Sequence, residues 1–177
     1  TEGFNPRIYM TYAMPLSLGV CGGRECMDIR LTEELPLEQI PEMLNAHLPK
    51  DLRVLAASEP VDKFEDIQFG DYEILLESEN PAALQEKIQK LLGRETILVR
   101  KHTKKGDRDV DIKPDFAQVT CSCQEGGVFL TMRLPCSVNG SINPALLLEA
   151  LKQYEEAEPF CTITRKRLLT KDFSEFR

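Results

Sequence analysis

The same order of residue patterns occurs in both halves of this chain, and that repeat limits its possible folds more than any other feature. Each half has two segments of alternating apolar residues, then apolar residues at helical spacing, then a further short apolar segment. At one constant offset, Ile29-Arg30-Leu31 and Met43, Leu44 and Leu48 align with Met132-Arg133-Leu134 and Leu146, Leu147 and Leu151. The repeat predicts two β-β-α-β patterns in an α+β protein.

The first half is predicted to contain strands over residues 8–14 and 26–31, which pair antiparallel as a hairpin. Gly22-Gly23 supplies the turn between them, since glycine adopts the positive φ values that hairpin turns need. Pro36 opens a helix whose apolar residues recur at helical spacing up to Leu48, and residues 52–56 form the next strand.

The second half adds a strand and a helix before its β-β-α-β pattern. A strand over residues 72–76 precedes a helix that begins at Asn80-Pro81, where asparagine caps the helix and proline fits its first position. Asn143-Pro144 begins a later helix in the same way. Strands over 118–123 and 128–134 pair antiparallel, and the last strand starts at Cys161. This order is that of a ferredoxin-like unit, elaborated by a basic hairpin over residues 100–114.

We therefore expect two ferredoxin-like units side by side. Residues 1–66 form the first unit, which is truncated at its N-terminus and keeps only β-β-α-β, and residues 67–177 form the second. With 42% hydrophobic residues, a chain of 177 residues can bury a core of this size.

The charges are segregated along the chain. The net charge of −7 argues against general nucleic-acid binding, yet residues 100–113 and 160–177 each carry an excess of basic side chains. No run of about 18 apolar residues occurs, so we expect no membrane contact. The six cysteines are expected to be reduced thiols of a cytoplasmic protein.

Several short motifs resemble those of one family. They are Gly3-Phe4-Asn5-Pro6, Ala13-Met14-Pro15-Leu16-Ser17-Leu18-Gly19-Val20, Met27-Asp28-Ile29-Arg30-Leu31, Lys104-Lys105-Gly106, Asp111-Ile112-Lys113-Pro114 and Asn143-Pro144. In this order they resemble the domain of unknown function that is fused or linked to radical SAM proteins. The resemblance implies a radical SAM protein as partner, in cis or in trans. It also implies a strand and a helix before the first motif, hence the truncation. Its motif residues include Phe4, Asn5, Pro6 and Asn143.

The cysteine spacing does not fit an iron–sulfur cluster of the radical SAM type, which needs a C-x3-C-x2-C run. The chain has Cys21-x4-Cys26 and Cys121-x-Cys123, and no histidine or second pair lies close enough in sequence to complete a zinc site. We expect no metal and no cofactor. Cys121, Cys123 and Cys161 are expected to be small buried apolar residues.

Catalytic residues are weakly indicated. No serine, histidine and aspartate set and no glycine-rich phosphate loop occurs. Paired ferredoxin-like units resemble the scaffold of pseudouridine synthases, which use one aspartate in a groove. Asp28 and Asp111 are the acidic candidates, because they are the polar residues nearest the motifs that carry the family resemblance described above. A shared scaffold does not transfer a reaction. An RNA-modifying enzyme that uses a groove carboxylate therefore stays an alternative.

Basic residues indicate a recognition surface instead. The candidates for nucleic-acid binding are Arg100, Lys101, His102, Lys104, Lys105, Lys113, Arg165 and Arg167. Arg165 and Arg167 are expected to share one face of the last strand, since alternate residues of a strand point the same way. Basic residues beside an open sheet suit RNA. We predict a non-catalytic module that binds RNA and serves a radical SAM enzyme; a protein-docking module without nucleic-acid contact is the other alternative.

Overall fold

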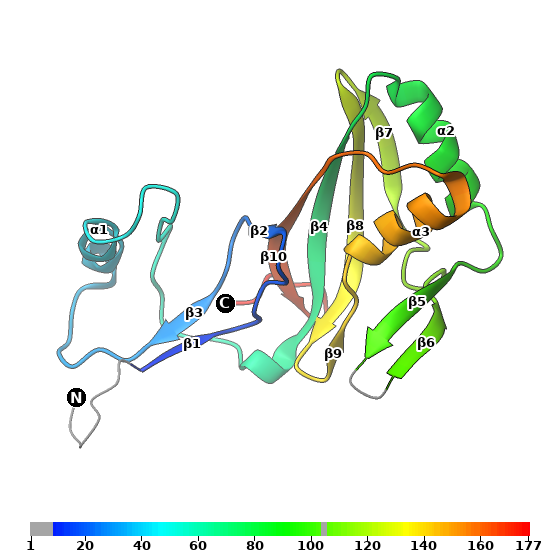
Figure 1. Ribbon diagram of the computed structural model, residues 1–177. Helices are drawn as coiled ribbons and strands as arrows, with labels where there is room; N and C mark the ends of the chain where they lie inside the picture. The colour runs from blue at the N-terminus through cyan, green and yellow to red at the C-terminus, as the bar shows by residue number, and fades with distance from the viewer. Residues whose placement is uncertain (1–8, 104–105) are drawn as a thin grey trace. The chain divides into compact units, whose positions relative to one another are not determined.

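The computed structural model describes residues 9–103 and 106–177, with the side chains of 101–103 left aside. The chain forms two compact units (Figure 1). The first takes the residues up to Ala13, then Cys26–Lys63 and Arg177, and the second takes Met14–Glu25 and Phe64–Phe176. No helix of the described ranges is long and apolar enough to cross a bilayer.

The second unit is built on a six-stranded sheet. Its strands are β2 (Val20–Gly22), β4 (Ile67–Glu77), β7 (Thr120–Gln124), β8 (Gly127–Ser137), β9 (Gly140–Ser141) and β10 (Cys161–Thr170). The order across the sheet is β2-β10-β4-β8-β7, with β9 paired to β8. All pairs are antiparallel except β2 and β10, which are parallel.

Helices α2 (Pro81–Leu92) and α3 (Ala145–Glu155) complete this unit. Figure 1 shows them on the same face of the sheet. The chain order β4-α2-β7-β8-α3-β10 is the β-α-β-β-α-β order expected from the sequence. The α+β fold is thus confirmed, and so is the pairing of the strands near 118–123 and 128–134.

Local sequence explains where α2 begins. The Asn80 side chain accepts a hydrogen bond from the Ala83 amide at 3.1 Å, and Pro81 occupies the first turn, where its missing N–H is not needed. Leu84, Ile88 and Leu91 recur at helical spacing, and all three are buried against the sheet. The core residues of the sheet on this face include Tyr72, Ile74, Leu76, Val128, Leu130, Met132, Leu134 and Ile163.

A hairpin is inserted between α2 and β7, as the sequence predicted. Strand β5 (Leu98–Thr103) pairs antiparallel with β6 (Gly106–Asp111). Its base is held in the core, because Ile97, Val99 and Ile112 are fully or almost fully buried. The hairpin is therefore a buried base that carries a charged, exposed arm.

The first unit is small. Strands β1 (Met10–Tyr12) and β3 (Met27–Ile29) pair antiparallel, which confirms that predicted pair. A 3-10 turn (Leu37–Gln39) leads into α1 (Ile40–Asn45), where Pro41 sits in the first turn and is tolerated there. Ile40 and Ala13 are the buried apolar residues of the described part of this unit.

The predicted strand over residues 52–56 does not form. The Asn45 side chain donates to the Val54 carbonyl at 3.0 Å and accepts from the Val54 amide at 2.8 Å. A side chain thus satisfies the backbone groups that a neighbouring strand would otherwise take. Without this strand, the duplication of a ferredoxin-like unit stays a prediction.

The segment around Gly22-Gly23, predicted as a hairpin turn, also differs from expectation. Val20–Gly22 is strand β2, which joins the large sheet beside β10. Gly23 then lies so close to β10 that its amide donates to the Arg165 carbonyl at 2.8 Å, and a Cβ there would stand 3.1 Å from that oxygen. Residues Met14–Glu25 therefore belong to the second unit, whereas the boundary predicted at residue 66 places them in the first.

Candidate functional site

The large sheet has one face covered by α2 and α3 and one that these helices leave uncovered, here called the open face. On β4, Tyr72, Ile74 and Leu76 are buried among the helices, whereas Asp71 and Glu73 alternate with them and point the other way. The same alternation along β8 places Phe129, Thr131 and Arg133 on the open face.

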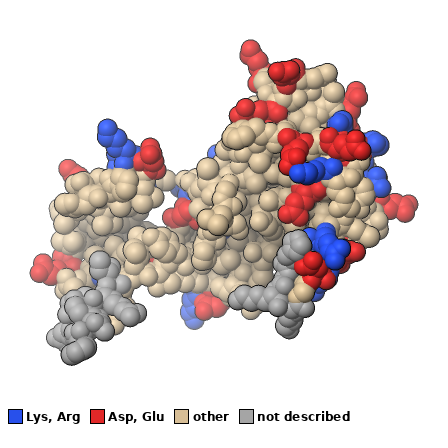
Figure 2. All heavy atoms as spheres, viewed as in Figure 1, with Lys and Arg blue, Asp and Glu red and all other residues tan. Residues whose placement is uncertain are grey.

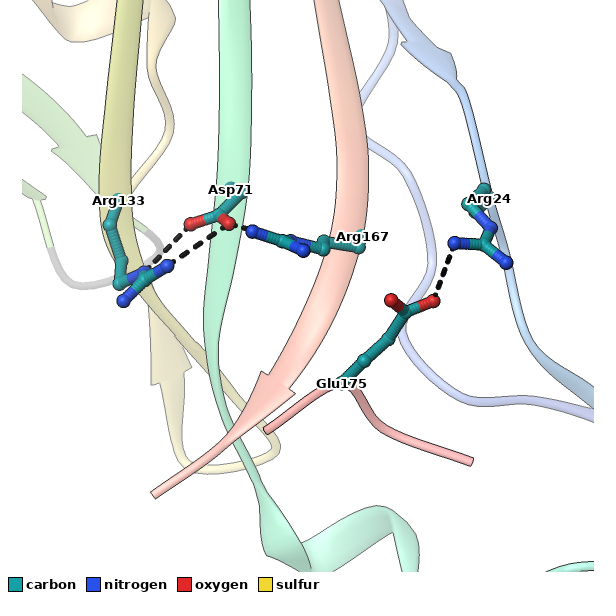
Figure 3. A network of polar contacts seen from close by, with 5 residues as sticks. All are labelled: Arg24, Asp71, Arg133, Arg167 and Glu175. Carbon is teal, nitrogen blue, oxygen red and sulfur yellow. Dashed lines mark hydrogen bonds and ion pairs between the residues drawn. The ribbon is translucent and has the colours of Figure 1, made fainter. Parts of the chain in front are cut away.

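An ion-pair network crosses three strands of the open face. Figure 3 shows Asp71 of β4 between Arg133 of β8 and Arg167 of β10. Arg133 donates to both carboxylate oxygens at 2.7 and 3.1 Å, and the Arg167 Nε donates at 2.8 Å. Two guanidinium groups thus share one carboxylate, which leaves one positive charge in excess.

The pKa of the Asp71 carboxyl reflects these neighbours. Burial alone would raise this pKa, but the hydrogen bonds and positive charges of Arg133 and Arg167 together outweigh burial and lower it below its ordinary value. The hydrogen bonds that Arg133 donates to Asp71 raise the pKa of the Arg133 guanidinium. Asp71 and Arg133 are therefore both charged at neutral pH.

An aromatic side chain lies over this network. The Arg133 guanidinium is 4.7 Å from the centre of the Phe173 ring, and Phe173 packs on Phe69 with ring centres 5.0 Å apart. Phe173 has a φ of 62°, which is uncommon for a residue with a side chain. Packing on Phe69 and Arg133 offsets the cost of that backbone conformation.

The network borders a groove of about 500 Å³. Its lining residues are Arg24, Asp71, Tyr72, Glu73, Gln118, Thr131, Met132, Arg133, Lys166 and Arg167. Arg24 pairs with Glu175 at 2.8 Å (Figure 3) and Lys166 pairs with Glu73 at 2.9 Å. Four basic side chains thus meet three carboxylates, so the groove is slightly positive on a chain whose net charge is −7.

An apolar area lies farther along the same face. Phe129 of β8 stands opposite Leu75 of β4 in the strand register, and both are at least partly exposed. Their neighbours Val128 and Leu130 are fully buried on the other face. Between this area and the ion pairs, the Thr131 and Thr120 hydroxyls are 2.6 Å apart.

The prediction that Arg165 and Arg167 share a face is wrong. The register of β10 against β4 shifts between these two residues, which marks a β-bulge at Lys166. The Arg165 side chain is 3% exposed and that of Arg167 is 46% exposed. A bulge adds one residue to the strand and so reverses the alternation.

Arg165 is held on the buried side by several partners. Its Nε donates to a Glu25 oxygen at 3.1 Å, and its Nη2 donates to the other Glu25 oxygen and to the Met14 carbonyl. Nearby, burial and Cys136 raise the pKa of Tyr72 to about 12. Arg165 therefore fastens the segment Met14–Glu25 to the sheet and is not available to a ligand.

Of the other predicted basic residues, the two with described side chains, Arg100 and Lys113, are not among the residues that line the groove. Arg100 lies on β5 and pairs with Asp107 at 3.5 Å, and the Lys113 Nζ donates to the Leu92 carbonyl. Lys101 and His102 are strand residues whose side chains are not described, while Lys104, Lys105, Phe4, Asn5 and Pro6 lie outside the described residues. In the view of Figure 2, basic side chains of the second unit lie beside acidic ones.

The two candidate carboxylates have different surroundings, each within its own unit. Asp111 accepts backbone hydrogen bonds from Ile97 at 2.8 Å and Lys113 at 3.0 Å, so it holds the base of the hairpin. Asp28 is exposed on β3. Asn143 accepts from the Ala145 amide at 3.0 Å and thus orders the start of α3.

The cysteines differ from expectation in part. Cys121 and Cys161 are partly buried, and burial raises the pKa of both thiols, but Cys123 is exposed and contacts the Gln85 side chain at 3.2 Å. Across residues 9–103 and 106–177, no group of three or more histidine, cysteine or acidic residues is placed to hold a metal ion.

Sequence reasoning missed Asp71, Arg133, Lys166, Arg24 and Phe173. Arg133 was visible as the polar centre of the repeated motif Met132-Arg133-Leu134, and Asp71 directly precedes an alternating apolar segment. The available signal for this site was a charged residue at an outward position of a predicted central strand. Phe173 carried no such signal, because its position depends on a turn after β10.

Comparison with known proteins identifies the family of this chain but does not indicate a reaction. A family model described as an uncharacterized protein conserved in bacteria (DUF2344) matches residues 1–144, which include Asp71 and Arg133 but not β10. Searches of curated proteins and of solved structures returned no match. Because the model matches most of the chain, the chain belongs to the DUF2344 family of uncharacterized bacterial proteins.

Proposed function

We propose that the chain is a recognition module that binds RNA on its open face and acts with a radical SAM enzyme, in cis or in trans. In this proposal the module has no reaction of its own. We infer this partner from the resemblance of the sequence motifs to the domain linked to radical SAM proteins.

One observation carries the RNA-binding part of the proposal. The groove gathers Arg24, Arg133, Lys166 and Arg167, whereas the chain as a whole is acidic. Arginine donors in a fixed arrangement suit phosphate oxygens. The Arg167 Nη groups have no hydrogen-bond partner among the described residues, because only Nε bonds Asp71. They are thus positioned to donate to a phosphate.

The ion pairs also limit what binds. Asp71, Glu73 and Glu175 offset most of the positive charge, so the groove does not attract every polyanion strongly. Specific contacts must then supply much of the affinity. An uncovered sheet face with hydroxyl, aromatic and arginine side chains supplies such contacts for RNA.

The test is RNA binding measured by fluorescence anisotropy over a range of salt concentrations. Arg167→Gln should weaken binding, because one phosphate contact is lost. The slope of log affinity against log salt concentration should become smaller by about 0.7. Lys152→Gln is the matched control, since Lys152 is an exposed, ion-paired cation on α3. It should bind as the unaltered protein does. No RNA binding at low salt, or equal effects of the two substitutions, would contradict the proposal.

Protein docking is the second candidate, and the first unit favours it. Many of its large apolar side chains are exposed, among them Tyr9 at 67%, Leu55 at 67% and Val61 at 75%. Exposed apolar side chains at this density on so small a unit favour an interaction surface. Co-purification of the full-length protein with its radical SAM partner, followed by sequencing of bound RNA, separates the candidates. Leu55→Ser with Val61→Ser should abolish partner binding and leave RNA binding intact.

A further inference from the structure

We infer that the open face takes single-stranded RNA laid along β8, with a base stacked on Phe129 and Leu75 and a phosphate bound by Arg133 and Arg167. This inference rests on the proposed RNA-binding function and names the class of RNA and the two ends of its site.

The stacking end is an aromatic ring without a ring partner in the described part of the chain. The open face carries two phenylalanines on its central strands, Phe69 of β4 and Phe129 of β8. Phe173 covers Phe69 at 5.0 Å, whereas Phe129 lies beside Leu75, which is 36% exposed. A partly exposed aromatic ring of this kind can stack with any base, because every base has a π-face.

The phosphate end is the pair of arginines that share the Asp71 carboxylate. Arg133 and Arg167 are held in place by Asp71, so they lose little conformational freedom when a ligand arrives. Two guanidinium groups exceed one carboxylate by one positive charge, which matches one phosphodiester group. The Phe173 ring over Arg133 further restricts the position of that guanidinium.

The spacing of the two ends favours a short extended strand of RNA. Phe129 and Arg133 are four residues apart on one face of β8, which is about 13 Å at the usual rise of a strand. The Thr131 and Thr120 hydroxyls lie between them and can bond sugar or base atoms. A duplex hides the faces of its bases, so it cannot use the Phe129 end.

Tryptophan fluorescence tests the stacking directly, because the chain contains no tryptophan. The fluorescence of a Phe129→Trp variant should be quenched by a single-stranded oligoribonucleotide and unchanged by inorganic polyphosphate, which has no bases. Gln89→Trp is the control reporter, since Gln89 is exposed on α2, which packs on the covered face. It should not respond to either probe.

Affinity measurements separate the two ends. Phe129→Ala should weaken single-strand binding by about 5- to 150-fold, the range for one stacked base, with an unchanged salt slope. Phe129→Tyr should retain binding, which controls for loss of folding. Duplex RNA of the same sequence should bind more weakly than the single strand.

The possible failures are distinct. If RNA binds with the predicted salt dependence but the Phe129→Trp variant is not quenched and Phe129→Ala binds normally, the stacking inference is wrong while the proposed function stands. Duplex binding equal to single-strand binding would overturn the inference in the same way. If no RNA binds at low salt, the inference and the proposed function both fail.

Discussion

Arg165 and Arg167 are two residues apart on β10, yet their side chains lie on opposite faces of the sheet. The bulge at Lys166 separates two tasks of the same strand. Arg165 fastens Met14–Glu25 on the covered side, and Arg167 joins Asp71 on the open side. The bulge is therefore what makes a basic strand both a structural support and a candidate ligand surface.

Arg165→Ala should destabilise the second unit strongly. The substitution leaves Glu25 without its buried partner, and breaking such a pair costs about 3–5 kcal/mol when both groups are buried. Glu25 is 27% exposed, so we expect the lower end of that range. Arg167→Ala, the matched control on the exposed side, should cost less than about 1 kcal/mol. Urea unfolding of both variants measures the difference, and similar losses would contradict the assigned roles.

Asp71 should make stability depend on pH at the acid end. The pKa of this carboxyl is lowered in the folded protein, so its contribution is present above the unfolded pKa near 3.8 and is lost as the pH falls through the folded pKa. Asp71→Asn should therefore be less stable at pH 7 by about 1–3 kcal/mol. The difference should shrink below pH 4. A constant difference down to pH 2 would show that Asp71 is not held by charge.

Phe173 offers a test of backbone strain. Its φ of 62° costs a residue with a Cβ about 1 kcal/mol but costs glycine almost nothing. Phe173→Gly should then be more stable than Phe173→Ala, the reverse of the usual order, although both lose the contacts with Phe69 and Arg133. Thermal unfolding of the two variants gives the order, and a less stable glycine variant would rule out strain at this position.

Asn45 should hold the loop that replaces the predicted strand over 52–56. Asn45→Ala removes two hydrogen bonds to Val54 and should cost about 1–2 kcal/mol in the first unit. Hydrogen exchange of the Val54 amide measures this loss locally, since that amide donates to the Asn45 side chain. Exchange at an unchanged rate in Asn45→Ala would mean that another group protects Val54.

The elements set by local residues were predictable. The start of α2 at Asn80-Pro81, the hairpin of β5 and β6 and the pairing of β7 with β8 all follow from caps, turns and alternation within short segments. The strand β2 was not predictable from Val20–Gly22, because its pairing with β10 joins segments that are far apart in the sequence.

The candidate site was harder to predict than the fold. Alternation correctly places Arg133 on the outward side of β8, but the bulge at Lys166 cannot be seen in a pattern of period two. The network around Asp71 needs three strands whose order in the sheet differs from their order in the chain. Such a site becomes visible only when the topology is known.

RNA binding on the open face is tested most directly by an NMR titration of the isotope-labelled protein with a short single-stranded oligoribonucleotide. If RNA binds the open face, the amide shifts concentrate on the open-face residues of β4, β8 and β10, including Asp71, Phe129, Arg133 and Arg167. The outer surfaces of α2 and α3 do not change. Shifts confined to those helices or to the first unit, or no shifts at low salt, would contradict RNA binding on the open face.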